Sequence, residues 1–402
     1  MQKKSQKIYT PKPTEEEAKN SYQNGGNNYR DNGQQRDGEK KAPIKLPGRY
    51  KIAQSDEKEF DLETCMENFK LSENPYEKES DYYFDSYSHF HIHEDMLKDK
   101  VRTLAYMNAI TKNPEIIKDK IVLDIGCGTG ILSIFAARAG AKHVYGIDNA
   151  GIANHARKII EENGFADKIT IIKGKVEEVV LPVDKVDIIV SEWMGYFLLY
   201  ESMLDTVLFA RDKWLAEDGI LMPDRSVIYL TAIEDGDYKA KKINFWDDVY
   251  GVSMKTIKSW ALLEPLVDTA DKEQINTDAC AILDLDHKTM KASEVEFASK
   301  WQLTAKRKDK VHALVAWFDV FFSFGGHPVR MSTSPMTKST HWKQTIFYLN
   351  DVIDVKKDDK LQGSIAVKKS RENPRALEIK LSYHVETETQ KLDKTQFYSL
   401  MQ

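Results

Sequence analysis

The chain has 402 residues, of which 41% are hydrophobic and 30% are charged. This is the composition of an ordinary globular protein, and the length allows two or three domains. The formal net charge of −5 at pH 7 argues against a general nucleic-acid-binding protein, since phosphate binding requires a basic face, although it is compatible with basic substrates.

The first 60 residues are polar throughout. The stretch SYQNGGNNYRDNGQQRDGEKK (21–41) is typical of a segment that cannot bury enough apolar surface to offset its ordering entropy. We therefore predict a disordered tail over residues 1–60. The same polarity argues against a secretory signal.

The three cysteines, Cys65, Cys127 and Cys280, are far apart and form no CxxC pair. This spacing argues against a structural zinc site or a disulfide framework and favours a reducing compartment. No apolar run approaches the ~18 residues that span a bilayer, so we expect no membrane segment. The expected location is the nucleus and the cytoplasm.

Residues 61–223 are predicted to hold N-terminal helices followed by a parallel sheet. Short apolar runs alternate here with helical stretches, and Leu132, Phe135, Ala136 and Ala139 repeat on one face of a helix. Continuous apolar strands separated by helices indicate an α/β domain whose sheet is covered on both sides. The predicted strands are KIVLDIG (120–126), HVYGID (143–148), KITIIKG (168–174) and VDIIVSE (186–192).

Residues 224–402 show a different pattern, which begins after the turn signal MPDR (222–225). Alternation of apolar and polar residues, clearest in ALEIKLSYHV (376–385), predicts an antiparallel sheet or barrel, and HALVAWFDVFFSF (312–324) and WKQTIFYL (342–349) also favour strands. An aromatic-rich helical or irregular segment interrupts the pattern at 235–260. It is either a contact surface for another subunit or packed on its own domain.

A glycine-rich loop, LDIGCGTG (123–130), follows the first predicted strand. Gly126, Gly128 and Gly130 allow a sharp turn and a close approach to a ligand, and Asp148 ends the next strand, where a ribose diol would bind. The D-x-G-x-G-x-G spacing departs from the dinucleotide pattern and suits S-adenosylmethionine, which has no phosphates. The alternative is a merely structural tight turn.

Two glutamates, Glu192 and Glu201, lie in the apolar stretch SEWMGYFLLYESML (191–204). Glu192 closes a strand at the sheet edge where ligands bind, and a returning loop would bring Glu201 to the same ligand. Two carboxylates can grip a planar, forked guanidinium and leave electron density on the nitrogen to be methylated. Alternatively, Glu201 is only a charge at the start of a helix.

The same stretch resembles the double-glutamate loop of the type I protein arginine N-methyltransferases. Three further motifs resemble that family in the expected order: DYYFDSYSHFHIHEDMLKDKVRT (81–103), with Tyr83 and Tyr87 in a YFxxY pattern; VLDIGCGTGILS (122–133); and STHWKQTIFY (339–348). The resemblance implies a Rossmann-like S-adenosylmethionine-dependent methyltransferase sheet, then an antiparallel β-barrel domain with a helical dimerisation arm at 236–270.

The resemblance also implies roles for individual residues. Glu192, Glu201, His341 and Asp99 are expected to be catalytic, with His341 relaying the released proton and Asp99 as its partner. Tyr83, Tyr87, Met203 and Trp342 are expected to bind substrate, and Met96 with Met203 to restrict the product. The expected S-adenosylmethionine-binding residues are His93, Met96, Arg102 (on the methionyl carboxylate), Asp124, Gly126, Gly128, Asp148, Val176 and Glu177.

The implied activity is methylation of protein arginines to monomethyl- and then asymmetric dimethylarginine. The implied partners are Arg-Gly-rich proteins and histones, together with a second copy of the chain, with no membrane and no direct nucleic-acid binding. Two departures from the family pattern stand out, because His91 replaces a usual glycine and Asp148 replaces a usual glutamate.

Three alternatives remain open: an arginine methyltransferase with another product type, a catalytically weak scaffold homologue, and a nucleic-acid or small-molecule methyltransferase. The adenine N6 enzymes of the last class usually carry an [DNS]PP[YFW] motif after the fourth strand, where this chain has SEWM (191–194).

Overall fold

The computed structural model describes Gly48 and residues 82–401, all within one compact unit that spans 43–402. The tail predicted for 1–60 therefore lies, except for Gly48, outside the described residues. No helix in the described part of the chain is long and apolar enough to cross a membrane.

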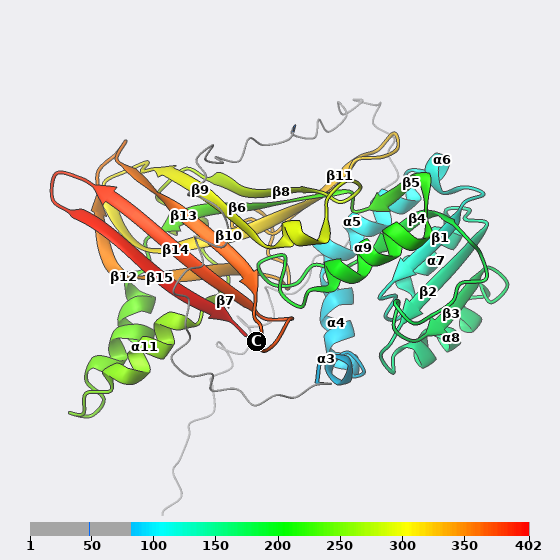
Figure 1. Ribbon diagram of the computed structural model, residues 1–402, viewed down its shortest axis with the longest axis horizontal. Helices are drawn as coiled ribbons and strands as arrows, with labels where there is room; N and C mark the ends of the chain where they lie inside the picture. Colours follow the sequence, from blue (N-terminus) through cyan, green and yellow to red (C-terminus); the bar gives the residue numbers. More distant parts are fainter. Residues whose placement is uncertain (1–47, 49–81, 402) are drawn as a thin grey trace, which may run out of the picture. The chain divides into compact units, whose positions relative to one another are not determined.

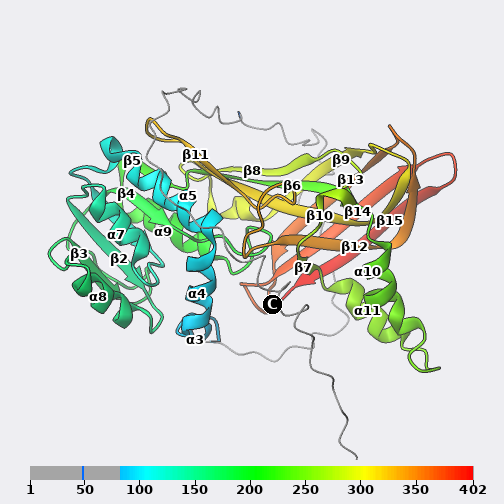
Figure 2. The same cartoon turned by 180° about the vertical axis from the view of Figure 1, so that it is seen from behind.

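The first half contains the predicted parallel sheet, in the order β3-β2-β1-β4-β5. Each apolar run predicted as a strand forms one. Three of these strands, β1, β2 and β4, are covered from both faces, whereas β3, at the edge of the sheet, exposes Thr170 and Lys173. Right-handed crossovers place α7 and α8 on one face and α9 on the other (Figures 1 and 2). The strands are β1 (Ile121–Ile125), β2 (His143–Asp148), β3 (Ile169–Lys173), β4 (Val186–Ser191) and β5 (Leu215–Met222).

The helices of this half cover the sheet and extend from it toward the barrel. They are α3 (Tyr82–Ser86), α4 (Phe90–Lys98), α5 (Lys100–Thr111), α6 (Pro114–Ile117), α7 (Ile131–Arg138), α8 (Ala153–Glu162) and α9 (Met203–Trp214). The helix predicted from the repeat that starts at Leu132 is α7, whose side chains from Leu132 to Ala137 are all buried.

The second half is the predicted antiparallel, barrel-like domain, built from two sheets. One sheet has the order β7-β12-β10-β6-β8, with β11 added to β10, and the other has the order β15-β14-β13-β9. The strands are β6 (Arg225–Ile233), β7 (Leu266–Asp268), β8 (Cys280–Asp286), β9 (Phe297–Thr304), β10 (Asp309–Phe322), β11 (Val329–Ser332), β12 (Gln344–Val355), β13 (Lys360–Lys369), β14 (Leu377–Glu386) and β15 (Lys391–Leu400). Two short helices, η3 (Lys272–Gln274) and η4 (Ala292–Val295), lie in connections.

The segment from α10 to α11 projects from the barrel as the arm (Figure 1). Its base packs on its own domain, because Tyr238 stacks on Tyr348 and the buried Lys239 Nζ donates to three carbonyls of the 349–351 segment. Further out, Tyr250 is fully exposed and Trp260 is 45% exposed. The base of the segment therefore packs on its own domain, and its outer part leaves aromatic side chains exposed. The elements are α10 (Gly236–Tyr238), η1 (Lys239–Ile243), η2 (Asn244–Asp247) and α11 (Lys255–Leu263).

Candidate active site

A cavity of about 560 Å³ opens at the carboxyl ends of β1, β2 and β4. α4 and residues of the barrel complete its wall, so both halves of the chain contribute to it. Every site residue predicted from the sequence lines this cavity except Asp99 and Asp124. Its volume lies in the range of pockets that bind drug-sized molecules.

The glycine-rich loop forms one end of the cavity. Gly126 and Gly128 have φ of +67° and +52°, and a Cβ on Gly128 would lie 3.4 Å from the ring of His93. The backbone N–H groups of Gly128 and Ala150 each donate to a different carboxylate oxygen of Asp148, at 2.8 Å. Asp148 therefore fixes the loop, and the remaining lone pairs of its oxygens can accept from a diol.

Asp124, which the family resemblance places among the cofactor-binding residues, does not line the cavity with its side chain. Residues alternate in direction along β1, and Asp124 points toward α7, where Ser133 Oγ donates to it at 2.6 Å. Burial raises its pKa to about 7, and its Oδ1 has no hydrogen-bond partner. Asp124 therefore ties β1 to α7, the two elements that flank the loop.

Val176, Glu177 and residues of α4 also line the cavity. Glu177 accepts a hydrogen bond from Thr206 Oγ1 at 2.9 Å. His93 is buried and its Nε2 lies 2.8 Å from the carbonyl oxygen of Tyr87, which fixes that nitrogen as the donor. His91, by contrast, is exposed and packs on Phe90, so it does not line the cavity.

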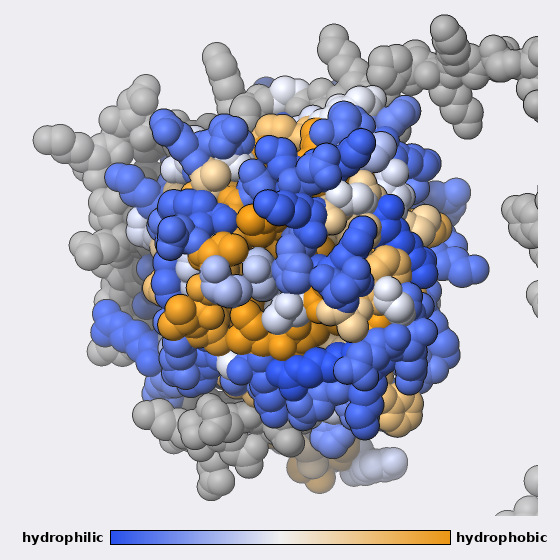
Figure 3. Space-filling model, turned by 90° about the vertical axis from the view of Figure 1, so that its right-hand side faces the viewer, coloured by the Kyte–Doolittle hydropathy of each residue, from blue (hydrophilic) through white to orange (hydrophobic). Residues whose placement is uncertain are grey.

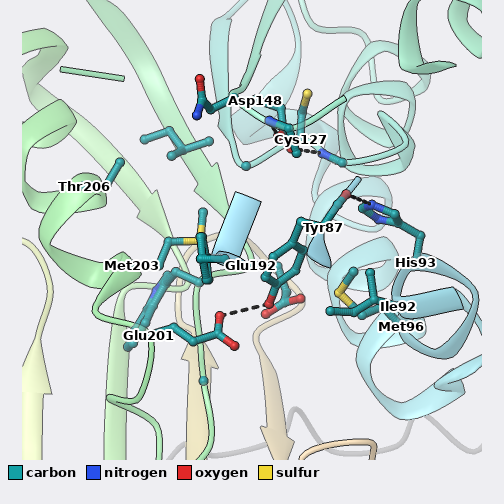
Figure 4. Close-up of a pocket in the computed structure, with 18 of the residues that line it drawn as sticks. Tyr87, Ile92, His93, Met96, Cys127, Asp148, Glu192, Glu201, Met203 and Thr206 are labelled. Carbon is teal, nitrogen blue, oxygen red and sulfur yellow. Dashed lines mark hydrogen bonds between the residues drawn. The ribbon is translucent and has the colours of Figure 1, made fainter. Parts of the chain in front are cut away.

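The loop from Glu192 to Glu201 brings both carboxylates to the same side of the cavity, next to Tyr87 (Figure 4). The loop folds back through a bridge between Gly195 and Leu198. Several of its residues adopt the left-handed backbone region, which is disfavoured for residues with a Cβ. They are Phe197, Leu198, Glu201 and Ser202, with φ between +51° and +76°.

Glu192 is held by a buried arginine. Arg102 Nε and Nη2 donate to Glu192 Oε2 at 3.0 and 2.8 Å, and both side chains are less than 10% exposed. Both bonds end on Oε2, which leaves Oε1 available to a second cation. Arg102 thus lies between the cofactor side of the cavity and the glutamate pair.

Glu201 is buried in the cavity wall, and its charge is strongly perturbed by its surroundings. Burial raises its pKa to about 7, and the nearby charge of Glu192 adds to this rise. A hydrogen bond from Tyr87 Oη, at 2.9 Å, and the positive charge of Arg375 oppose it. An arriving cation would therefore favour the ionised form of Glu201.

We expect Glu201→Gln to raise the melting temperature above about pH 7. The folded-state pKa of Glu201, about 7, exceeds its ordinary value of 4.5, so the fold loses stability as pH rises from about 4.5 to about 7, and the loss is complete above about pH 7. Neutral glutamine removes this penalty, which amounts to at most about 3 kcal/mol. Thermal melts at two pH values test it: near pH 4.5 the difference should shrink, because wild-type Glu201 is then largely protonated when folded. An identical difference at both pH values would contradict it.

His341 lies on the barrel side of the cavity and binds Asp99. Its Nδ1 and its backbone N–H both lie within 2.9 Å of Asp99 Oδ2. Burial opposes ionisation of Asp99, but hydrogen bonds from His341 and from the Arg102 backbone outweigh it and lower the pKa of Asp99. Asp99 is therefore the partner of His341 that the family resemblance implied, and its side chain does not itself line the cavity.

Trp342 is almost completely buried, and its Nε1 donates to the carbonyl oxygen of Met194 at 2.7 Å. It also packs edge-on against Phe318 of β10. One edge of Trp342 lines the cavity, while most of the side chain ties the double-glutamate loop to the barrel.

Sequence reasoning missed Arg375, which lines the cavity from the turn between β13 and β14. Its guanidinium carbon lies 3.6 Å from the ring centroid of Tyr83, and its Nη1 donates to the carbonyl oxygen of Glu201 at 2.9 Å. Nothing in the local stretch SRENPRAL (370–377) distinguishes this residue from a surface arginine.

Comparison with known proteins agrees with this geometry. The arginine methyltransferase oligomerization subdomain matches residues 224–389, and ribosomal protein L11 methyltransferase (PrmA) matches residues 103–225. Protein arginine N-methyltransferase 1 of Chlamydomonas reinhardtii is 56% identical over 321 residues, which cover 80% of this chain and 93% of that protein. Protein arginine N-methyltransferase 1 of Schizosaccharomyces pombe is 59% identical over 303 residues, 75% of this chain and 89% of that protein.

Among solved structures, the Trypanosoma brucei PRMT1 enzyme-prozyme heterotetrameric complex with AdoHcy superposes with a TM-score of 0.77 at 43% identity, and the match covers 79% of this chain and 100% of that chain. Protein arginine methyltransferase 10 of Arabidopsis thaliana gives 0.72 at 30% identity, with the same coverage. The glycine-rich loop, the paired glutamates and these relatives agree, and the chain belongs to the protein arginine N-methyltransferase family of S-adenosylmethionine-dependent enzymes.

Proposed function

We propose that this enzyme is a type I protein arginine N-methyltransferase, which forms monomethylarginine and then asymmetric dimethylarginine in Arg-Gly-rich proteins and histones. The observation that carries the proposal is the convergence of Glu192 and Glu201 on Tyr87, in a cavity continuous with the glycine-rich loop. Two carboxylates in such a cavity suit a guanidinium, which is planar and charged at every physiological pH.

The residues at the loop end fit S-adenosylmethionine. Gly126 and Gly128 line the cavity with positive φ and no Cβ, so a ligand can approach their backbone, although Met203 occupies the space next to Gly126. Asp148 offers unused acceptor lone pairs where a ribose would lie. Arg102 offers a cation within the cavity for a carboxylate. When bound, S-adenosylmethionine supplies the methyl group as an electrophilic sulfonium.

The protein contributes orientation and charge. Glu192 is oriented by Arg102, and Glu201 by the hydroxyl of Tyr87, so that both can accept hydrogen bonds from one substrate guanidinium. When the two carboxylates accept hydrogen bonds from two nitrogens of the substrate guanidinium, the third nitrogen, which is to be methylated, keeps more electron density. His341, held by Asp99 through Nδ1, presents Nε2 to accept the proton released.

We attribute the asymmetric product to the side chains around the glutamates. Met96 and Met203 line the cavity, and the hydroxyl of Tyr83 contacts the sulfur of Met203 at 4.0 Å. These bulky side chains restrict the orientation of a monomethylated guanidinium, so that the second methyl group goes to the same nitrogen.

Labelled S-adenosylmethionine tests the proposal with an Arg-Gly-rich peptide and the same peptide carrying Lys for Arg. We expect label only in the arginine peptide, and hydrolysis should then yield monomethyl- and asymmetric dimethylarginine. Label in both peptides, or in neither, would overturn the substrate assignment, and symmetric dimethylarginine would overturn the type I assignment.

We further propose a homodimer in which the arm, with exposed Phe245, Tyr250 and Trp260, docks on the parallel-sheet domain of a second copy. The match to an oligomerization subdomain supports this. Figure 3 views the parallel-sheet domain from the end opposite the barrel, where apolar side chains form a band among hydrophilic ones, as a docking surface requires.

Light scattering at micromolar concentration should give twice the mass of one chain. A charge in the arm, as in Trp260→Glu, should shift the protein toward the monomer, because burying an unpaired charge is costly. Phe324→Glu, at an exposed aromatic residue outside the arm, is the matched control. A wild-type protein that is monomeric throughout would contradict the dimer.

We also propose residence in the nucleus and the cytoplasm. The free thiols of Cys127 and Cys280 support a reducing compartment. Imaging of the tagged full chain tests this, and confinement to a secretory compartment would contradict it.

A further inference from the structure

The turn between β13 and β14 contacts the double-glutamate loop through its backbone. The N–H of Glu201 donates to the carbonyl oxygen of Arg375 at 2.8 Å, and Arg375 Nη1 donates back to the carbonyl oxygen of Glu201 at 2.9 Å. Ser202 Oγ donates to the carbonyl oxygen of Pro374. The barrel therefore holds both residues that precede α9.

These two residues need such support. Glu201 and Ser202 have φ of +76° and +57°, a backbone region that a residue with a Cβ keeps only where its surroundings hold it. The turn provides partners for the backbone groups on both sides of the Glu201 Cα. The direction of the Glu201 side chain therefore depends on a turn more than 170 residues later in the chain.

The same arginine contacts the N-terminal helix. Its guanidinium carbon lies 3.6 Å from the ring centroid of Tyr83 and 5.3 Å from that of Phe84, both in α3. Cation–π contacts at such distances are favourable, more so for a planar guanidinium than for an ammonium group. Tyr83 in turn contacts Met203 at the start of α9.

We propose that Arg375 is a positioning residue, which fixes Glu201 in its left-handed conformation and holds α3 against the cavity. One guanidinium thereby joins the barrel turn, the glutamate loop and the helix that covers the site. This inference rests on the proposed role of Glu201 in binding the substrate.

The charges around Glu201 predict a change in the pH profile of Arg375 variants that a purely structural role of Arg375 would not produce. Removing the positive charge of Arg375 leaves the effects of burial and of Glu192 less opposed, so the pKa of Glu201 rises further. The acid limb of kcat/KM, which requires ionised Glu201, should then move to higher pH. The ionisable groups that face Glu201 are Tyr83 and Tyr87 from the α3 segment, Glu192 and Tyr196 from its own loop, and Arg375 from the turn.

The experiment compares Arg375→Ala, Arg375→Lys and Arg371→Ala in the full chain. Arg371 is an exposed arginine of the same turn and serves as the control. kcat and KM for an Arg-Gly-rich peptide are measured from about pH 6 to 9, to span the acid limb. Amide hydrogen exchange of residues 82–88, without substrate, reports separately on whether α3 is held.

Arg375→Ala should lower kcat by about 10- to 100-fold, the effect of a misplaced catalytic group, and should move the acid limb to higher pH. It should also accelerate exchange across residues 82–88. Arg375→Lys should retain the wild-type acid limb, because the charge remains, yet show reduced kcat and faster exchange, because lysine cannot stack as a plane. Arg371→Ala should match the wild type throughout.

Wild-type kinetics, pH profile and exchange in Arg375→Ala would overturn the inference. If Arg375→Ala does not fold, Arg375→Lys tests the inference in its place. Wild-type kcat and wild-type hydrogen exchange in Arg375→Lys would then overturn the inference. A wild-type enzyme that leaves arginine peptides unmodified would refute the proposed function instead, and the exchange measurement would still test the contact with α3.

Discussion

Glu192→Gln should reduce kcat/KM for an arginine peptide by at least about 1,000-fold. The lost charge-assisted hydrogen bond contributes roughly 1.5–3 kcal/mol, or about 10- to 160-fold. The variant also loses the negative charge that leaves electron density on the nitrogen to be methylated, and the two losses together give the larger effect. S-adenosylmethionine affinity should change by less than about tenfold, because the glutamine oxygen can still accept from Arg102. Steady-state kinetics and calorimetric titration measure the two effects.

An exposed carboxylate near the cavity provides the control for this experiment. Glu178 is next to the lining residue Glu177, but its side chain is 71% exposed. Glu178→Gln removes the same charge without touching the guanidinium site, and its turnover should remain close to that of the wild type. Retained turnover in Glu192→Gln would remove Glu192 from the mechanism.

Arg102→Ala should eliminate measurable S-adenosylmethionine binding and also lower the melting temperature. The Arg102 and Glu192 side chains are 8% and 7% exposed, so the variant leaves a buried carboxylate without its partner. Breaking one side of such a pair typically costs about 3–5 kcal/mol. Calorimetry and thermal melts measure the two losses separately.

The double variant Arg102→Ala/Glu192→Gln separates these two losses. It removes the unpaired charge and should recover most of the lost stability, while cofactor binding stays absent because the cation is still missing. A single variant Arg102→Ala with wild-type stability would show that Glu192 does not depend on this pairing.

Much of the fold was predictable because it follows from local patterns. The apolar runs that became β1, β2 and β4 are continuous, since both faces of the parallel sheet are covered, and β14 alternates with period two, since one face packs inward. The paired glutamates could be predicted as a site because charged residues are rare in an apolar stretch that follows a ligand-binding loop.

The sequence was less informative about side-chain direction. Asp124 lies in the cofactor motif, but the pleat of β1 turns it away from the cavity and toward Ser133. The family resemblance implied that Asp99 pairs with His341, and the structure shows this contact, but the sequence did not reveal that Asp99 also caps α5. These outcomes depend on which face of an element meets which neighbour, and a motif alone does not specify that.

The sequence by itself determined the chemical groups of this protein and their order along the chain: the glycine-rich loop, the two glutamates, the histidine of the barrel and the two sheet types. Only the tertiary structure decided that Arg102 holds Glu192 and that Arg375 holds Glu201. The pairs are 90 and 174 residues apart, so their contacts arise only when the barrel and the N-terminal helices close around the loop. Local sequence patterns set propensity and burial, whereas such long-range contacts are set by packing of the whole chain.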